Sequence, residues 1–235
     1  MSTSLKFSPR PGLLLGYLFL CCLPAASAEN QKLAPHTRIV TSREADLKTA
    51  DGIKQKLNPG EVVLITERGR LIARDAGDGL TSVNMGDPQL RWDEVPLAHE
   101  MDTLELPIDG APTATGMGNP HCTFFVEDAE SVDLEARGSE IEHHPLYPQR
   151  TNVQFASLIG DNHLRMRVWE RGSGETLACG TGACAAVVAG VLAGVNERRV
   201  TVHLRGGDLE IEWAESGEVY MTGPSTEVFS GEWNP

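Results

Sequence analysis

Residues 170–186, which read ERGSGETLACGTGACAA, are the stretch that decides the expected fold of this chain. Before them, apolar residues at 164, 166 and 168 alternate with Arg or Trp, the period-two pattern of a half-buried strand. After them, residues 183–193 are rich in Ala, Val and Leu and contain no Pro, which predicts a buried helix. Cys179 therefore falls in the loop between a strand and the start of a helix.

The position of Cys179 points to a functional thiol. A helix start presents backbone N–H groups and the positive end of the helix dipole. That environment stabilises a thiolate and lowers the thiol pKa, and the same N–H groups suit a carboxylate. The alternative is an inert core cysteine, since Cys is among the most buried residue types. The small residues 180–182 leave the backbone at Cys179 approachable, which favours the functional interpretation, whereas Cys122 and Cys184 are expected to be core residues.

Composition limits the classes of partner. A chain of 235 residues can form one large or two small domains. Its net charge of -13, without a clustered Lys/Arg stripe, disfavours nucleic acids and anionic membranes as partners. The five cysteines have neither zinc-site nor disulfide spacing, which indicates reduced thiols and the cytosol. Adjacent side chains such as His143 and His144 point apart, so no metal site is predicted there.

The N-terminus indicates a different compartment. Lys6 and Arg10 precede an apolar run at 13–23 and then Ala26-Ser27-Ala28, so residues 1–28 resemble a secretory signal that is too short to span a bilayer. The alternative is a leader without biological meaning, produced by a wrong start codon or a frameshift. Residues 29–60 are polar, with only a weak helical pattern at 43–57.

From residue 61 onward, short apolar runs separated by turn signals predict strands. The expected strands are 62–65, 71–73, 80–85, 103–106, 122–126, 153–158, 200–204, 209–213 and 219–222. The RGGD sequence at 205–208 predicts a hairpin, and a short acidic helix is expected at 129–141. Many short strands with one buried helix predict a mixed α/β fold, in which a curved mixed sheet wraps around that central helix.

Two polar clusters adjoin these predicted strands. In the sequence MGNPH at 117–121, Asn119 and His121 are placed to face a cleft, although Gly-Asn-Pro also forms a good turn by itself. In the second cluster, RTN at 150–152, Asn152 opens a strand. A simple turn at the start of that strand explains Asn152 equally well.

Four motifs in order resemble the diaminopimelate epimerase family. They are MGNPH at 117–121, EHHP with RTN within 142–152, ERG at 170–172, and GETLACGTGAC at 174–184. The similarity runs from about residue 61 to the end, and the last motif is specific to that family. The resemblance implies two similar α/β domains, each a curved sheet around a central helix, with a small-molecule substrate between them. It also implies interconversion of LL- and meso-diaminopimelate, on the route to lysine and peptidoglycan, without a metal or organic cofactor.

The same resemblance assigns roles to individual residues. In this family one thiolate removes the α-proton while a thiol from the other domain delivers a proton to the opposite face. Cys179 matches the second-domain thiol, and His121 and Glu170 match residues that support the chemistry. The matching substrate-binding positions are Asn119, Asn152, Glu170, Arg171, Gly180 and Thr181. Of these, Gly180 and Thr181 would hold the α-carboxylate through their N–H groups, and Arg171 suits the distal carboxylate.

The chain departs from the family in its first sixty residues. They contain neither the Asn-x-Asp-Gly segment nor the Cys-Gly-Asn motif of the first domain, and Cys21-Cys22 is not followed by Gly-Asn. We therefore expect 80–224 to be the second epimerase domain and 61–79 with 225–235 to be a remnant of the first. A single thiol cannot perform a two-thiol reaction, so the chain as written is expected to have little epimerase activity.

Three interpretations stay open at this point. The first is a cytoplasmic epimerase, monomer or homodimer, whose 5′ coding region is altered. The second is a secreted amino-acid-binding module without catalysis, and the third is a proline racemase-like relative or an isomerase that uses a carboxylate base. The motif at 174–184 disfavours the third interpretation. A Cys-Gly-Asn motif in another reading frame upstream of codon 61 would favour the first over the second.

Overall fold

The computed structural model describes residues 40–41, 46–48, 54–56, 61–66 and 69–226. In these parts of the chain the fold is mixed α/β, with one large sheet of twelve strands and few helices. In spatial order, eleven of its strands are β1 (Val40–Thr41), β4 (Glu61–Thr66), β5 (Gly69–Gly77), β6 (Leu80–Asn84), β14 (Val219–Pro224), β13 (Gly207–Trp213), β12 (Arg199–Leu204), β10 (His163–Glu170), β9 (Asn152–Gly160), β8 (Pro120–Phe125) and β7 (Thr113–Gly116). The twelfth, β11 (Gly174–Thr176), pairs with β10.

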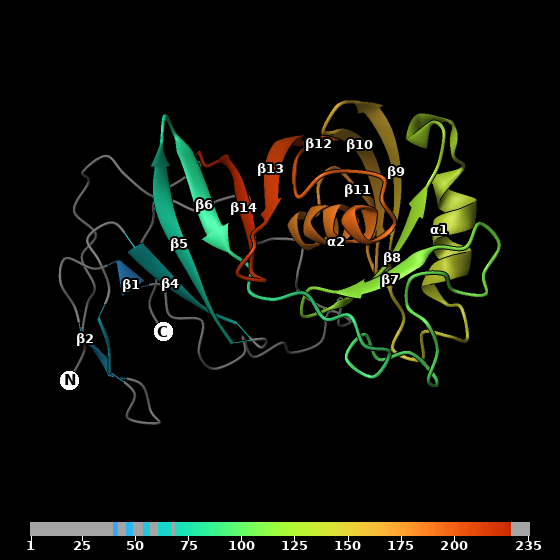
Figure 1. The fold of residues 1–235 in the computed structure, drawn as a ribbon, viewed down its shortest axis with the longest axis horizontal. Helices are drawn as coiled ribbons and strands as arrows, with labels where there is room; N and C mark the ends of the chain where they lie inside the picture. Colours follow the sequence, from blue (N-terminus) through green and yellow to red (C-terminus); the bar gives the residue numbers. More distant parts are fainter. Residues whose placement is uncertain (1–39, 42–45, 49–53, 57–60, 67–68, 227–235) are drawn as a thin grey trace.

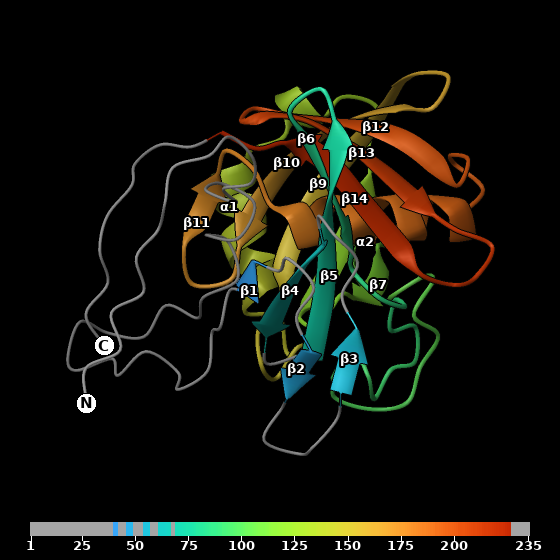
Figure 2. The ribbon, with the colours of Figure 1, turned by 90° about the vertical axis from the view of Figure 1, so that its left-hand side faces the viewer.

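The sheet curves around helix α2 (Gly180–Leu192), as Figures 1 and 2 show. Its neighbouring strands are antiparallel except for the parallel pairs β8–β9 and β10–β12. Every residue from Thr181 to Gly190 is buried, which fits a helix that is apolar on all sides. The structure therefore confirms the predicted curved mixed sheet around a buried central helix.

Side-chain alternation along β8 and β9 divides the core in two. Cys122, Phe124, Val153 and Phe155 belong to a cluster with helix α1 (Leu134–Glu142), whereas Ala156 belongs to the cluster around α2. Successive side chains of a strand point to opposite faces, so each strand contributes to both clusters. The rings of Phe124 and Phe155 stack with their centroids 4.9 Å apart on the α1 side. Polar residues on the other face are thereby directed toward α2.

Most of the predicted strands are present, but residues 103–106 are not a strand. The Thr103 carbonyl accepts a hydrogen bond from the Ala114 N–H at 2.7 Å, and the Thr103 hydroxyl donates to the Leu90 carbonyl at 2.8 Å. The Leu106 N–H donates to the Pro112 carbonyl at 2.9 Å. These single bonds to separate segments replace a regular ladder. Apolar content without sustained alternation was too weak a signal for a strand.

The helix predicted at 129–141 is two shorter helices. A 3-10 helix, η2 (Ala129–Ser131), is capped by Asp128, whose Oδ1 accepts from the Glu130 N–H at 3.0 Å. Helix α1 then starts after Asp133, whose Oδ1 accepts from the Ala136 N–H at 3.1 Å. Each aspartate satisfies an N–H group at a helix start, so the two Asp residues begin two separate helices.

The helix suggested by the weak pattern at 43–57 is also wrong for those of its residues that the structure describes. Strands β2 (Asp46–Lys48) and β3 (Lys54–Lys56) pair antiparallel, with Leu47 opposite Gln55. The sequence between them includes Asp51-Gly52, a dipeptide typical of hairpins. The signal-like leader lies outside the described residues. Within the described residues, no helix is both long enough and apolar enough to cross a membrane.

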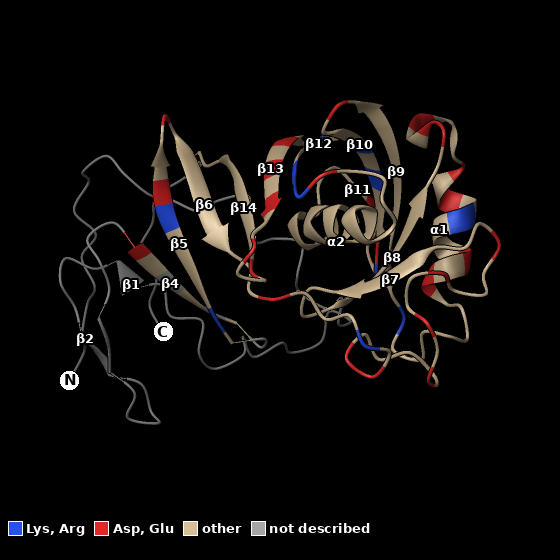
Figure 3. Ribbon diagram, viewed as in Figure 1, with Lys and Arg blue, Asp and Glu red and all other residues tan. Residues whose placement is uncertain are grey.

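Strands β4 and β5, from the segment predicted to be a first-domain remnant, continue the same sheet. β5 pairs with β6, with Arg74 opposite Ser82, and β6 pairs with β14. The division into 61–79, 80–224 and 225–235 stays a prediction. Figure 3 shows Lys and Arg scattered among acidic residues over the described part of the chain, rather than gathered into one stripe.

Candidate active site

Cys179 is the N-cap of helix α2, on extended backbone (φ -139°, ψ 107°). Its carbonyl accepts the first helical hydrogen bond, from the Ala183 N–H at 2.9 Å. The helix thus begins at Gly180, three residues before the predicted start, because the Gly-Thr-Gly sequence forms its first turn. The Cys179 thiol is fully buried, with Sγ 3.6 Å from the Thr181 hydroxyl.

The loop before Cys179 is held by the turn between β12 and β13. The Gly206 N–H donates to the Leu177 carbonyl at 2.8 Å. A Cβ atom at residue 206 would come within 3.1 Å of the Ala178 Cβ, so glycine permits this close approach. Leu177 itself is 66% exposed, directly before the buried thiol. The hairpin that the RGGD sequence predicted therefore positions the strand-to-helix loop.

A chain of polar contacts links the thiol to His121. The Thr181 hydroxyl lies 3.4 Å from Asn119 Nδ2, which donates to it. Asn119 Oδ1 lies 2.9 Å from His121 Nε2. His121 is fully buried on β8, although it was predicted from a motif that also reads as a turn. Four of the predicted site residues, including Cys179, therefore lie in one connected group.

Gln154 extends this chain and was not among the predicted site residues. Its side-chain nitrogen lies 2.9 Å from His121 Nδ1, and its oxygen accepts from the Thr123 hydroxyl at 3.4 Å. The parallel register places Thr123 beside Gln154 and His121 beside Asn152. The signal in the sequence was the period of two: Gln154 follows Asn152 on the same face of β9.

Asn152 and Arg171 are joined through the backbone. Asn152 Nδ2 donates to the Pro120 carbonyl at 3.1 Å, and its Oδ1 accepts from the Arg171 N–H at 2.9 Å. The Arg171 guanidinium donates to the Gln149 carbonyl at 3.1 Å. Asn152 therefore ties the start of β9 to the start of β8 and to the loop after β10.

A pocket of about 290 Å³ lies beside this group of residues. It is lined by Gln89, Glu94, Pro96, Gly118, Asn119, Pro120, Gln149 and Arg171. The positive guanidinium of Arg171 and the amide of Asn119 give it groups that pair with a carboxylate and a polar substituent. Cys179 is not among the residues that line this pocket, and Thr181 and Asn119 connect it to the pocket wall.

Glu142 organises the loop that carries Arg171. Its side chain is 4% exposed, and Oε2 accepts from the Trp169 indole N–H at 2.7 Å. Oε1 accepts from the Gly172 N–H at 2.8 Å and from the Arg150 guanidinium at 3.1 Å. A buried carboxylate needs such partners, since an unpaired buried charge is very costly. The motif EHHP contained Glu142, but the sequence alone did not indicate its role.

Glu170 is 3% exposed and closes β10 next to this loop. Its carboxylate accepts a hydrogen bond from the Thr176 hydroxyl on β11. The β10–β11 register, with Glu170 opposite Gly174, holds that carboxylate at the base of the loop leading to Cys179.

The two other cysteines of the described segments lie in the core, as expected. Cys184 and Cys122 are fully buried, in the α2 and α1 clusters respectively. Burial raises the pKa of the Cys122 thiol from its ordinary value of 9.0 to about 12, which the Tyr147 hydroxyl beside it counteracts in part. The folded protein therefore keeps this thiol protonated where an unfolded chain loses its proton.

This pKa difference predicts a loss of stability at alkaline pH. Between about pH 9 and 12 the unfolded chain releases the Cys122 proton and the folded chain retains it, so stability falls as pH rises. The contribution reaches at most about 1.4 kcal/mol per pH unit. Urea unfolding measured across this range should show a shallower fall for Cys122→Ala than for the unmodified chain. Parallel curves would contradict the assignment.

His143 and His144 do not act together. His143 Nδ1 lies 2.9 Å from the Ser139 carbonyl, whereas His144 Nδ1 accepts from the Leu146 N–H at 3.2 Å. Each imidazole is thus bound to its own local backbone. Among the residues that the structure describes, no group of three or more His, Cys, Asp or Glu side chains is arranged to hold a metal ion.

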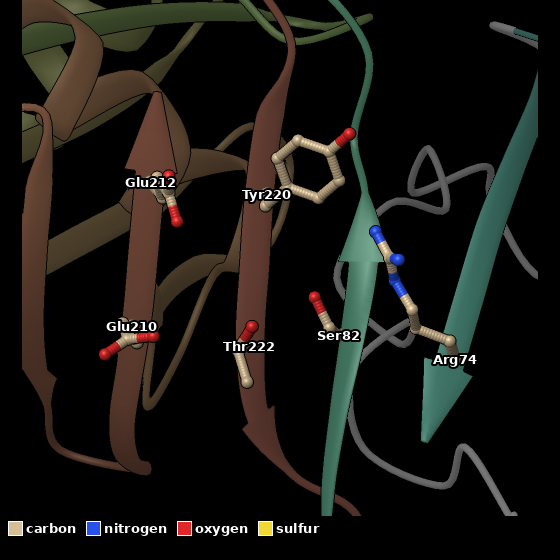
Figure 4. A pocket seen from close by; sticks show the side chains of 6 residues that line it. All are labelled: Arg74, Ser82, Glu210, Glu212, Tyr220 and Thr222. Atoms are coloured by element: carbon tan, nitrogen blue, oxygen red, sulfur yellow. The ribbon is translucent and has the colours of Figure 1, made fainter. Parts of the chain in front are cut away.

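A second hollow, of about 240 Å³, lies on the face of the sheet away from α2 (Figure 4). It is lined by Arg74, Ser82, Glu210, Glu212, Tyr220 and Thr222. Their strand neighbours Leu209, Ile211 and Met221 point the opposite way, into the core. None of the predicted site residues lines this hollow, so the candidate site is the group around Cys179.

Comparison with known proteins gives a consistent family. Residues 113–228 match the family model for diaminopimelate epimerase. The chain is 48% identical over 198 residues to a diaminopimelate epimerase of Pelotomaculum thermopropionicum, covering 81% of this chain and 68% of that protein. It is 54% identical over 163 residues to one of Desulfitobacterium hafniense, covering 66% and 58% respectively.

The solved structures show likeness in fold alone. A probable proline racemase from Agrobacterium radiobacter K84, with bound carbonate, has a TM-score of 0.50 and 16% sequence identity, over 72% of this chain and 59% of that one. The chain spans 58–68% of the length of the two sequence relatives named above.

Proposed function

Because this chain belongs to the diaminopimelate epimerase family, we propose that it acts in the cofactor-independent interconversion of LL- and meso-diaminopimelate. The observation that carries the proposal is the Cys179 thiol at the start of α2, joined through Thr181 and Asn119 to His121. As in the family, we place the reaction in the cytoplasm.

In the proposed reaction Cys179 exchanges a proton with the α-carbon of the substrate. As a thiolate it removes the α-proton, while a second thiol on the opposite face delivers a proton to the same carbon. In the reverse direction Cys179 is the donor. The N–H groups of Gly180 and Thr181 at the helix start suit the α-carboxylate, and the helix dipole favours the negative charge that develops there.

The remaining residues of the site bind the substrate in this proposal. Arg171 pairs with the distal carboxylate from the wall of the 290 Å³ pocket, where Asn119 also lies. Asn152 holds the Arg171 backbone in place, and Glu170 offers a buried carboxylate for the substrate ammonium group. A doubly zwitterionic amino acid has both of the charges that these groups complement.

We further propose that a polypeptide of these 235 residues, tested alone, exchanges the α-proton slowly. Cys184 shares the apolar cluster around α2 with Cys179, and Cys122 belongs to the α1 cluster on the other face of β8. Cys184 lies more than one helical turn beyond Cys179 and Cys122 faces the α1 cluster, so in this proposal neither is the opposed second thiol. A homodimer that supplies a second thiol stays a prediction.

Deuterium exchange at the α-carbon of diaminopimelate in D2O tests this reaction directly. For the 235-residue polypeptide we expect exchange far below the rate of a complete epimerase. Fast exchange that disappears in Cys179→Ala but persists in Cys184→Ala would support the role of Cys179 and overturn the need for another thiol. The Cys184 variant is a matched control, because it removes a buried thiol from the same helix.

Calorimetric binding of meso-diaminopimelate separates the remaining outcomes. Binding without exchange is expected if the pocket is formed and the second thiol is absent. Neither binding nor exchange, in a protein shown to be folded by circular dichroism, would overturn the proposed substrate.

A further inference from the structure

We infer that Gln154 is a positioning residue that sets the tautomer of His121 and, through it, the direction of the hydrogen bonds that run through Asn119 and Thr181 to Cys179. The hydrogen-bond inference stands on the contacts alone. Its catalytic meaning rests on the proposed function, in which Cys179 works as a thiolate. The inference is carried by the contacts between β8, β9 and the first turn of α2.

The donor-to-acceptor direction is set first at the buried end of this series of hydrogen bonds, at Thr123 and Gln154. The Thr123 hydroxyl donates to the Gln154 side-chain oxygen at 3.4 Å. In this orientation of the Gln154 amide, its NH2 group lies 2.9 Å from His121 Nδ1. An amide nitrogen donates and does not accept, so His121 Nδ1 is the acceptor. A neutral imidazole with an accepting Nδ1 carries its proton on Nε2.

The same direction then continues toward the sulfur. His121 Nε2 donates to Asn119 Oδ1 at 2.9 Å, which turns the Asn119 NH2 group toward the Thr181 hydroxyl oxygen at 3.4 Å. The Thr181 hydroxyl proton is then directed at Cys179 Sγ, 3.6 Å away. Hydrogen bonds that run in one direction polarise one another, and a donor aimed at the sulfur favours the thiolate.

Burial and packing keep Gln154 in this orientation. Gln154, His121 and Thr123 are each fully buried, so water does not compete for their polar groups. Helix α2 closes over the amide at Gly182, where an added Cβ would lie 3.1 Å from Gln154 Nε2. A side chain at residue 182 would therefore press on the group that orients His121.

The first test reads the tautomer in the unmodified chain. Nitrogen-15 NMR distinguishes a protonated imidazole nitrogen from a bare one, and His121→Gln identifies the resonances of His121. We expect the proton on Nε2 and a bare Nδ1. A ring protonated on Nδ1 alone would overturn the inference without any variant of Gln154, and independently of diaminopimelate.

The second test reverses the polarity at Gln154. In Gln154→Glu the carboxylate accepts, so His121 Nδ1 is expected to gain a proton. Gln154→Met supplies neither donor nor acceptor and should leave a mixture of tautomers. Asn162→Asp, the same amide-to-carboxylate change at an exposed turn, should leave the His121 signals unchanged. If His121 keeps a bare Nδ1 in a folded Gln154→Glu protein, the inference is wrong.

A third variant tests the first hydrogen bond of the series, from Thr123 to Gln154, in case Gln154 variants fold poorly. Thr123→Val removes the hydroxyl that donates to the Gln154 side-chain oxygen and should bring both His121 tautomers into the spectrum. Thr123→Ser keeps a hydroxyl and should restore the single tautomer. A purely structural role for Thr123 would not make the tautomer follow the hydroxyl, so identical spectra for Val and Ser would overturn the proposed direction.

Discussion

Replacing Glu142 by alanine is expected to lower the free energy of unfolding by about 3 kcal/mol, because two partly buried hydrogen bonds to its charged carboxylate are lost. The Trp169 indole N–H and the Gly172 N–H both donate hydrogen bonds to this carboxylate. A hydrogen bond to a charged group contributes about 1.5–3 kcal/mol. The Arg150 partner is 45% exposed and can return to water, so its ion pair adds little.

Urea unfolding followed by circular dichroism measures this loss. Glu142→Gln should lose less, because its amide oxygen still accepts one of the bonds. Glu140→Ala, at an exposed position of the same helix, is the matched control and should change stability by less than about 0.5 kcal/mol. Equal effects at 140 and 142 would show that the Glu142 hydrogen bonds contribute nothing net.

The Glu142 variant should also affect the candidate site. Glu142 binds the Gly172 N–H, one residue after Arg171, so its loss frees the loop that carries the guanidinium. A weaker affinity for diaminopimelate is therefore expected in Glu142→Ala at temperatures where the protein is still folded. The control Glu140→Ala should bind as the unmodified chain does.

Replacing Gly138 by alanine is expected to destabilise the fold by about 2 kcal/mol, although alanine favours helices over glycine by about 1 kcal/mol. A Cβ on Gly138 would lie 2.6 Å from both Cβ and Cγ of Trp169. These atoms are at the root of the indole side chain, so relief requires a shift of helix α1 or strand β10. Either shift strains the Trp169 bond to Glu142.

A double-mutant cycle with Trp169→Gly tests the cause of that loss. If the clash with Trp169 causes it, Gly138→Ala should cost much less in the Trp169→Gly background, which removes both clashing atoms, giving a coupling energy on the order of 1–3 kcal/mol. Full additivity of the two changes would place the cause elsewhere. A stabilising effect of Gly138→Ala in the unmodified background would contradict the observed packing.

Local patterns were sufficient for much of the fold. Alternation predicted β10, the RGGD turn predicted the β12–β13 hairpin, and the apolar run after Cys179 predicted α2. The errors occurred where single contacts override weak patterns. Residues 103–106 bond to separate segments instead of a ladder, and Asp128 and Asp133 cap two helices where one was expected.

The residues of the candidate site also divide into those that local motifs revealed and those that they did not. Cys179, Asn119, His121 and Asn152 were recognised because their motifs stand beside predicted strands or a helix start. Gln154 and Glu142 were not recognised, because their roles depend on partners 33 and 27 residues away in sequence, His121 and Trp169. No local pattern records which buried donor meets which acceptor.

The sequence by itself determined the family, the sheet curved around a buried helix, and a thiol at the start of that helix, because periodicity and glycine placement act over a few residues. Only the tertiary structure decided that the thiol ends a directed hydrogen-bond chain from Gln154, and that Glu142 holds the Arg171 loop. The physical reason is that hydrogen-bond direction and the satisfaction of a buried charge are set by strand register and packing, which join segments far apart in the chain.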